Sequence, residues 1–128
     1  MSVVRLLESK QWINRFSFEQ SINARLSFLR YGPGHYFKPH CDGIVDVLDG
    51  QQKSFVTLHL YLNDGDGLAG GATRFWTPNR KEYIDVEPKL GRVLIFQQRM
   101  LIHSGEEVTS GVKYTMRSDF LYEIGSDN

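Results

Sequence analysis

Residues 54–62, SFVTLHLYL, form the segment that most narrowly limits what this chain can fold into. In a strand, alternate side chains point to opposite faces, so Leu58 and Leu60 share one face while Thr57 and His59 share the other. The aliphatic face must be buried, whereas a face that mixes aromatic and hydrogen-bonding groups is typical of a pocket wall. The segment therefore predicts a strand with a hydrophobic layer on one side and a polar cavity on the other.

From residue 26 onward, glycine-rich turns divide the chain into about eight short strand-like runs. This pattern predicts a mostly β domain, either a sandwich or a jelly roll of the cupin-like kind. In a jelly roll, strands from the beginning and the end of the chain lie side by side, which is the arrangement that a metal site inside the barrel requires. The predicted strands cover residues 25–31, 36–42, 54–62, 72–76, 82–86, 91–97, 101–103 and 113–123.

The amino-terminal part of the chain shows a different pattern. Residues 3–16 predict a short N-terminal helix, because their apolar side chains could form one stripe along a helical surface. We therefore expect a helical segment over residues 1–25, a β domain over residues 26–124 and a frayed tail over residues 125–128. The apolar stripe consists of Val3, Val4, Leu7 and Trp12.

The composition excludes several classes of protein. Fifteen lysines and arginines balance fifteen aspartates and glutamates, which removes the broad positive surface expected of a nucleic-acid-binding protein. No apolar run approaches the ~20 residues that a membrane span requires, and the amino terminus lacks the pattern of a signal peptide. The single cysteine fits a reducing compartment. We expect a soluble protein of the cytoplasm or nucleus, with no nucleic-acid or membrane partner.

Three residues suggest a metal site. The string KPHCDG places His40 and Asp42 two residues apart, so that on a strand both side chains reach one ion while Cys41 points away. His103, in the string LIHSG, can join them only if the fold brings a later strand alongside. Two imidazoles and one carboxylate on one side of a metal form the ligand set of non-heme Fe(II) oxygenases.

Two cations near the carboxyl terminus raise a second question. Lys113 and Arg117 lie on the same face of the predicted last strand, and a buried charge without a partner is very costly. In one interpretation both cations are solvated or paired with Glu106, Glu107 or Asp119. In the other, one of them holds the distal carboxylate of a small dicarboxylate cosubstrate beside the iron.

From Leu29 to Tyr122 the chain resembles the 2-oxoglutarate- and Fe(II)-dependent dioxygenases of the prolyl 4-hydroxylase-like group. The resemblance rests on the order and spacing of the strings RYGPGHYFKPHCDG, SFVTLHLYLND, GGATRFW, LGRVLIFQ and LIHSG, followed by GVKYTMRSD. It covers about three quarters of the chain and implies a double-stranded β-helix.

The resemblance also implies roles for particular residues. His40, Asp42 and His103 would bind Fe(II), and Lys113 would hold 2-oxoglutarate. Because other branches of the family use an arginine at the anchor position, Arg117 is a second candidate, and the sequence does not separate the two. Further cosubstrate-binding residues implied with them are Tyr31, Tyr61 and Thr73, with His59 as another wall residue.

The implied activity is hydroxylation of a peptidyl prolyl or related substrate with dioxygen, with release of succinate and carbon dioxide. The substrate would be a peptide, a protein or a small molecule, and ascorbate is an additional candidate cofactor. Two alternatives stay open at this point. One is a cupin-like module that binds a metal or ligand without turnover, and the other is an inactive fragment, because residues 1–25 provide less helical support than family members usually have.

Overall fold

The structure is a computed structural model that describes residues 3–6, 20–65 and 67–123. These residues form strands and connecting turns, with no helix among them. No helix in this part of the chain is therefore long and apolar enough to cross a membrane. The strands are β1 (Val3–Leu6), β2 (Gln20–Ile22), β3 (Ser27–Tyr31), β4 (Phe37–His40), β5 (Asp46–Val47), β6 (Gln52–Tyr61), β7 (Ala69–Gly70), β8 (Thr73–Trp76), β9 (Tyr83–Val86), β10 (Val93–Gln97), β11 (Ile102–Gly105), β12 (Val108–Ser110) and β13 (Lys113–Glu123).

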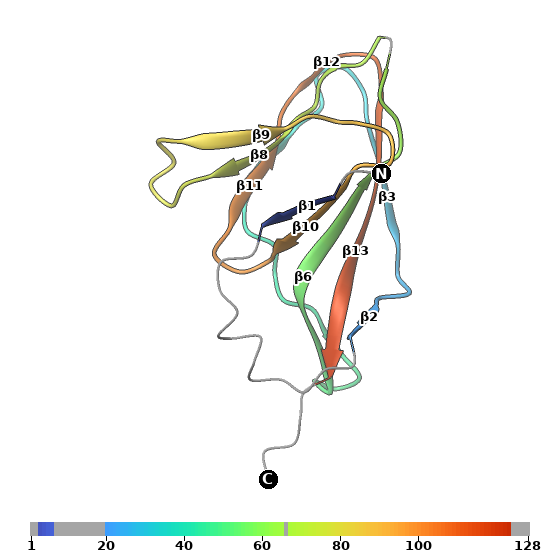
Figure 1. Ribbon diagram of the computed structural model, residues 1–128, viewed down its shortest axis with the longest axis vertical. Helices are drawn as coiled ribbons and strands as arrows, with labels where there is room; N and C mark the ends of the chain where they lie inside the picture. The colour runs from blue at the N-terminus through green and yellow to red at the C-terminus, as the bar shows by residue number, and fades with distance from the viewer. Residues whose placement is uncertain (1–2, 7–19, 66, 124–128) are drawn as a thin grey trace.

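Two main sheets make up the molecule. The larger has the order β1-β10-β6-β13-β2, with β3 also paired to β13 and β5 to β6. The smaller has the order β4-β11-β8-β9, and β12 pairs with β7 in a short third sheet. Figure 1 shows the long strands β6 and β13 side by side, with β8, β9 and β11 forming the neighbouring layer. This curled, mostly β architecture confirms the predicted jelly roll.

The eight strands predicted from the sequence are all present, with ends that differ by a few residues. The N-terminal helix is wrong for residues 3–6, which form β1 and pair in parallel with β10. A β-branched Val-Val pair suits a strand, and the edge of β10 offers backbone partners that outweigh a weak helical stripe. The remainder of the predicted helix, residues 7–16, lies outside the described residues, and so does the predicted tail. The boundary at residue 25 stays a prediction.

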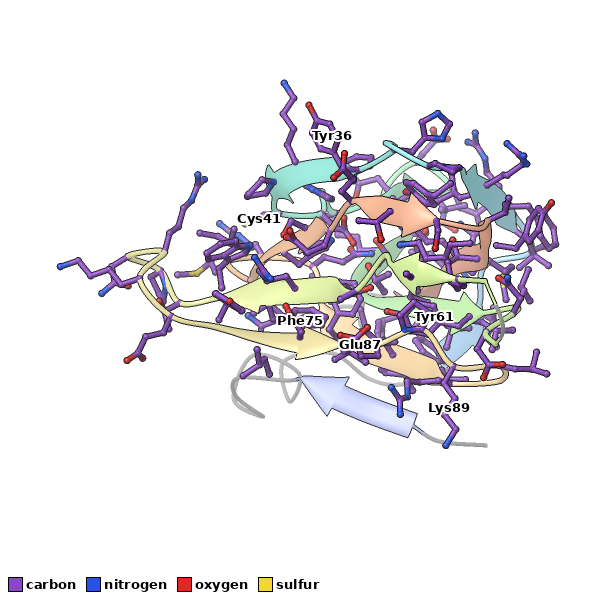
Figure 2. All side chains as sticks on the ribbon, turned by 90° about the horizontal axis from the view of Figure 1, so that it is seen from above. Tyr36, Cys41, Tyr61, Phe75, Glu87 and Lys89 are labelled. Atoms are coloured by element: carbon purple, nitrogen blue, oxygen red, sulfur yellow. The ribbon has the colours of Figure 1, made fainter. Side chains whose placement is uncertain are left out.

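The hydrophobic core lies between the two sheets. Phe75 of β8 and Phe96 of β10 meet edge to face, with ring centroids 5.1 Å apart, and Tyr61 and Leu94 are fully buried beside them. In Figure 2, Tyr61 and Phe75 lie in the interior, whereas Tyr36 lies at the periphery. The polar face of β6 therefore looks into the space between the sheets, as the alternation of SFVTLHLYL predicts.

Candidate metal and cosubstrate site

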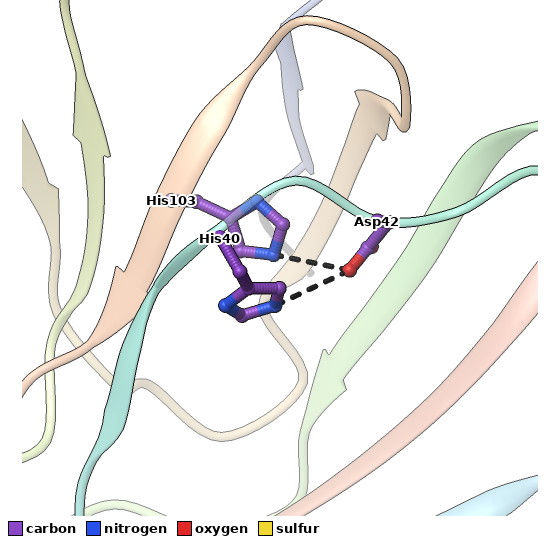
Figure 3. A group of neighbouring side chains, drawn as sticks. All are labelled: His40, Asp42 and His103. Carbon is purple, nitrogen blue, oxygen red and sulfur yellow. Dashed lines mark ion pairs between the residues drawn. The ribbon is translucent and has the colours of Figure 1, made fainter.

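Pairing between β4 and β11 brings the three predicted metal ligands together. His40 is the last residue of β4, and its backbone is the direct antiparallel partner of His103 in β11. Asp42 follows two residues after His40, where the chain crosses toward β6 (Figure 3). Cys41, between the two, is exposed. The cross-strand register thus joins a residue from the first third of the chain to one from the last third.

The geometry of these side chains suits a small cation. One ligand atom from each residue lies within 4.8 Å of the other two, and Asp42 Oδ1 is 3.4 Å from Nε2 of both histidines. The Nδ1 atom of His40 lies 2.6 Å from Lys38 O, and that of His103 lies 3.3 Å from Leu101 O. A carbonyl can only accept a hydrogen bond, so Nδ1 carries a proton in both rings, and Nε2 is the nitrogen that would bind a metal once its own proton is absent.

The second carboxylate oxygen of Asp42 already has two partners. Thr57 donates a hydrogen bond of 2.7 Å to Oδ2, and Arg117 Nη2 lies 3.2 Å from the same atom. Burial acts to raise the pKa of Asp42, but His103, Arg117 and Thr57 outweigh it and hold the pKa at about 2. The carboxylate is therefore ionised at neutral pH, as a metal ligand must be.

Aromatic rings surround the two histidines. The Phe37 ring centroid lies 4.2 Å from that of His40, and the Phe96 ring meets His103 edge to face at 4.8 Å. Phe75 lies 5.9 Å from His103 on the core side. These contacts limit the orientations of the imidazoles. They also shield the buried His103 from water, whereas His40 and Phe37 remain partly exposed.

The triad forms one end of a cavity of about 490 Å³, a volume that includes its open mouth. Strands of both sheets line this cavity, and Lys113 lies at its other end. Lys113 is 2% exposed. Its Nζ donates to Gly71 O at 2.9 Å and lies 4.5 Å from the centre of the Tyr31 ring. Burial lowers the pKa of Lys113 to about 8, and no carboxylate in the described ranges offsets this effect.

The space for the Lys113 side chain depends on the two glycines at the start of the string GGATRFW. Gly70 and Gly71 have φ angles of +75° and +78°, a region that residues with a Cβ rarely adopt. A Cβ on Gly70 would lie 2.2 Å from Glu107 O, and one on Gly71 would lie 3.2 Å from Lys113 Cδ. The two glycines therefore let β7 approach β12 and leave room for the lysine side chain.

Two buried polar atoms on the strands β6 and β13 have no partner in the described part of the chain. Among the described residues, His59 Nε2 and Thr115 Oγ1 are the buried side-chain atoms without a hydrogen bond. Burial lowers the pKa of His59 to about 3, helped by the nearby charges of Lys113, Arg117 and His103, so its ring is neutral. Buried polar groups are normally hydrogen-bonded, so these two atoms have hydrogen-bonding capacity that the described part of the protein does not use.

The other predicted site residues differ in position. Tyr31 and Thr73 line the cavity. Tyr61 does not line it: its hydroxyl contacts Thr73 Oγ1 and donates to Val86 O at 3.3 Å. Arg117 lines the cavity but lies against Asp42 rather than beside Lys113.

Sequence reasoning missed one polar residue behind the triad. Gln98 is fully buried and hydrogen-bonds to Thr57, which in turn donates to Asp42. Alternation could not reveal this residue because Gln98 follows the end of β10, where the strand pattern no longer applies. The polar pair QQ directly after the apolar run VLIF was the only available signal.

Comparisons with solved structures support this architecture. A prolyl-4-hydroxylase from Pseudomonas putida is 25% identical with a TM-score of 0.59, over 80% of this chain and 52% of that chain. A viral collagen prolyl hydroxylase from Paramecium bursaria Chlorella virus-1, solved with 2-oxoglutarate, is 24% identical with a TM-score of 0.61, over 85% and 62%. A prolyl hydroxylase from Trichoplax adhaerens, in complex with a fragment of hypoxia inducible factor, is 21% identical with a TM-score of 0.60, over 80% and 46%.

The chain thus spans about half to three fifths of the length of these structures. Comparison with curated proteins gave no significant match. The model of the 2OG-Fe(II) oxygenase superfamily, however, matches residues 26–118, which is most of the chain. By that match, the chain belongs to the 2OG-Fe(II) oxygenase superfamily.

Proposed function

We propose that this chain is an Fe(II)- and 2-oxoglutarate-dependent dioxygenase that hydroxylates prolyl residues, or closely related side chains, in a peptide. The single observation that carries the proposal is the arrangement of the cavity. A triad of two histidines and one aspartate lies at one end, and a buried lysine without a carboxylate partner in the described ranges lies at the other.

The donor set of the triad fits Fe(II). His40 and His103 would each bind through Nε2 as neutral rings, and Asp42 would bind through Oδ1, so a bound divalent ion would keep a net charge of +1. Three protein ligands on one side of the ion leave positions for small molecules. Bound iron and 2-oxoglutarate would supply the activation of dioxygen, with release of succinate and carbon dioxide, while the protein orients the reactants and excludes water.

The lysine end fits the distal carboxylate of 2-oxoglutarate. Lys113 would supply the charge, and Thr115 Oγ1 and His59 Nε2 are buried polar atoms that lack partners in the described part of the protein. A carboxylate accepts several hydrogen bonds, and charge-assisted bonds are the stronger ones. We favour Lys113 over Arg117 as the anchor because Arg117 already faces Asp42. Tyr31 and Thr73 would complete this end, with Tyr61 supporting Thr73 from behind.

The substrate assignment rests on two observations. The similar structures are prolyl hydroxylases, one of them bound to a peptide fragment. In addition, Phe37 lines the cavity and is 48% exposed, and its neighbour Tyr36 is 64% exposed, so aromatic side chains are available to a peptide beside the triad. Aromatic residues of this kind favour peptide contacts.

Two measurements test the proposal. Anaerobic addition of Fe(II) and 2-oxoglutarate should produce a weak visible charge-transfer absorption that neither component gives alone. Addition of oxygen and a proline-containing peptide library should then yield succinate together with peptides that have gained one oxygen atom. A folded protein that showed no such absorption would contradict the oxygenase assignment. The absorption without any modified peptide would retain the cofactors and contradict the prolyl substrate.

A further inference from the structure

A chain of buried hydrogen bonds behind Asp42 is not used by the proposed reaction. It begins at Val45, whose backbone N–H donates to Ser54 Oγ at 2.8 Å, and Ser54 donates in turn to Gln98 Oε1 at 2.8 Å. Gln98 Nε2 then donates to Thr57 Oγ1 at 3.2 Å. Ser54, Thr57 and Gln98 are each 0% exposed, so water cannot replace any of these contacts.

The donor and the acceptor of each hydrogen bond in this series can be assigned. Gln98 Nε2 carries two hydrogens and has two acceptors, Thr57 Oγ1 and Asp119 Oδ1, the latter at 2.7 Å. The ionised carboxylate of Asp42 can only accept, so the single proton of Thr57 Oγ1 points to Asp42 Oδ2, 2.7 Å away, while a lone pair of the same oxygen accepts from Gln98. The amide of Gln98 thus holds the Thr57 hydroxyl in the orientation in which it donates to the carboxylate.

This direction has a consequence for metal binding. Asp42 Oδ2 is occupied by the Thr57 hydroxyl and by Arg117, so Oδ1 is the oxygen that remains directed at His40 and His103. A carboxylate held in this way presents one oxygen to an ion rather than two. Hydrogen bonds of this kind orient metal ligands, and their loss typically costs 10–100-fold in metal affinity.

We propose that Gln98 is a positioning residue, which acts through Thr57 to fix Asp42 in the orientation that offers a single oxygen to the metal. The proposal rests on the function proposed above, since it takes Asp42 as a ligand. Gln98 touches neither the metal nor the cosubstrate in this arrangement. Its effect reaches the site only through the donor direction of one hydroxyl.

The test measures the affinity of the protein for Mn²⁺ alone, which binds the same donors without turnover. Thr57→Val removes the donor and should weaken Mn²⁺ binding about 10–100-fold, whereas Thr57→Ser keeps the hydroxyl and should stay near wild type. Gln98→Glu offers Thr57 a competing acceptor and should cause a loss similar to that of Thr57→Val. Gln98→Met removes the amide without adding an acceptor, so its loss should be smaller.

The double variant separates positioning from a general structural effect. If Gln98 acts through Thr57, the Gln98→Glu/Thr57→Val protein should bind Mn²⁺ no more weakly than Thr57→Val alone. Gln97→Met is the matched control, because Gln97 is a buried glutamine next in sequence whose amide donates to Arg99 O instead. Its Mn²⁺ affinity should equal that of the wild type. If Gln98→Glu fails to fold, the same cycle with Gln98→Met decides.

The outcomes separate the two proposals. A folded Gln98→Glu protein with wild-type Mn²⁺ affinity, or losses that multiply in the double variant, would overturn the role of Gln98 and leave the metal site intact. If replacing His103 with Ala left the Mn²⁺ affinity at the wild-type value, the proposed function itself would be overturned.

Discussion

The two ends of the cavity differ in how far the protein satisfies its own polar groups. At the triad end, Asp42 faces both histidines through one oxygen and has Thr57 and Arg117 on the other. At the lysine end, Lys113 has a backbone carbonyl and an aromatic face as its neighbours, and two buried polar atoms close to it have no partner in the described structure.

Under the proposed function, this difference corresponds to two modes of binding. The triad end is organised in advance, because its carboxylate is ionised and held by hydrogen bonds before any ion arrives. The lysine end carries an electrostatic cost that an anionic ligand would relieve, since an unpaired buried charge is unfavourable. We therefore expect substitutions at the triad end to weaken metal binding. Replacing the buried charge at the lysine end should lower the affinity for the cosubstrate but raise the stability of the protein.

The largest effect is expected at the triad end. Replacing Asp42 with Ala should abolish measurable Fe(II) or Mn²⁺ binding, because it removes the only anionic ligand of the three and leaves Arg117 facing the two imidazoles. Isothermal titration and the metal-dependent rise in melting temperature check this result. Asp46→Ala is a matched control, since Asp46 lies nearby on β5 and is exposed. Metal binding retained in Asp42→Ala would remove this residue from the ligand set.

The next largest effect distinguishes the two cations. Lys113→Met should weaken 2-oxoglutarate binding at least about 100-fold, because loss of one partner of a buried ion pair costs roughly 3–5 kcal/mol. Arg117→Met should weaken it less than about 10-fold, since Arg117 interacts with Asp42. Titration of 2-oxoglutarate into the metal-loaded protein measures both constants, with the exposed Lys89→Met as control. The reverse order of the two losses would make Arg117 the anchor.

The residues at the triad end were largely predictable from the sequence, whereas those at the lysine end were only partly so. His40 and Asp42 are two residues apart on an extended segment, and local periodicity alone places both on one side. His103 could be added because strand order in a jelly roll brings early and late strands together, which the register of β4 and β11 confirms. These inferences need only the face on which a side chain lies.

Contacts between strands required the structure. Tyr61 lies on the predicted face of β6, yet its hydroxyl is taken up by Thr73 and by Val86 O from neighbouring strands. Alternation specifies the direction of a side chain but not the group that it meets across the fold. For the same reason the partners of Gln98 could not be foreseen. The strand at residues 3–6 was missed because its formation depends on the edge of β10, which is 90 residues distant in the chain.

The pH dependence of stability should show the cost of Lys113 directly. Its pKa is about 8 in the folded protein and returns to its usual value of 10.5 on unfolding. Between these pH values the unfolded chain binds more protons, so the free energy of unfolding contributed by this group rises with pH. The penalty is fully present below pH 8 and amounts to on the order of 3 kcal/mol.

Comparison of urea denaturation between wild type and Lys113→Met isolates this contribution. The variant should be the more stable protein at pH 7, and the difference should shrink as the pH rises from 8 to 10.5. Saturating 2-oxoglutarate and metal should remove the advantage of the variant, because the bound carboxylate stabilises the charged lysine of the wild type. A variant that was less stable than wild type at pH 7 would show that Lys113 contributes more by packing than its charge costs.

The smallest effect is expected for the Tyr61 hydroxyl, which lies behind the cavity wall and already has partners. Tyr61→Phe keeps the buried ring and removes contacts to Thr73 and Val86 O. One hydrogen bond contributes about 1 kcal/mol, so 2-oxoglutarate affinity should fall only about 5-fold. Thr115→Val provides the comparison, because the Thr115 hydroxyl is buried and without a partner in the described residues, and a bound carboxylate would be its first acceptor. Tyr61→Phe could weaken 2-oxoglutarate binding as strongly as Lys113→Met only if the Tyr61 hydroxyl left Thr73 and bound the cosubstrate. That result would contradict the assignment of Tyr61 to a supporting position behind Thr73.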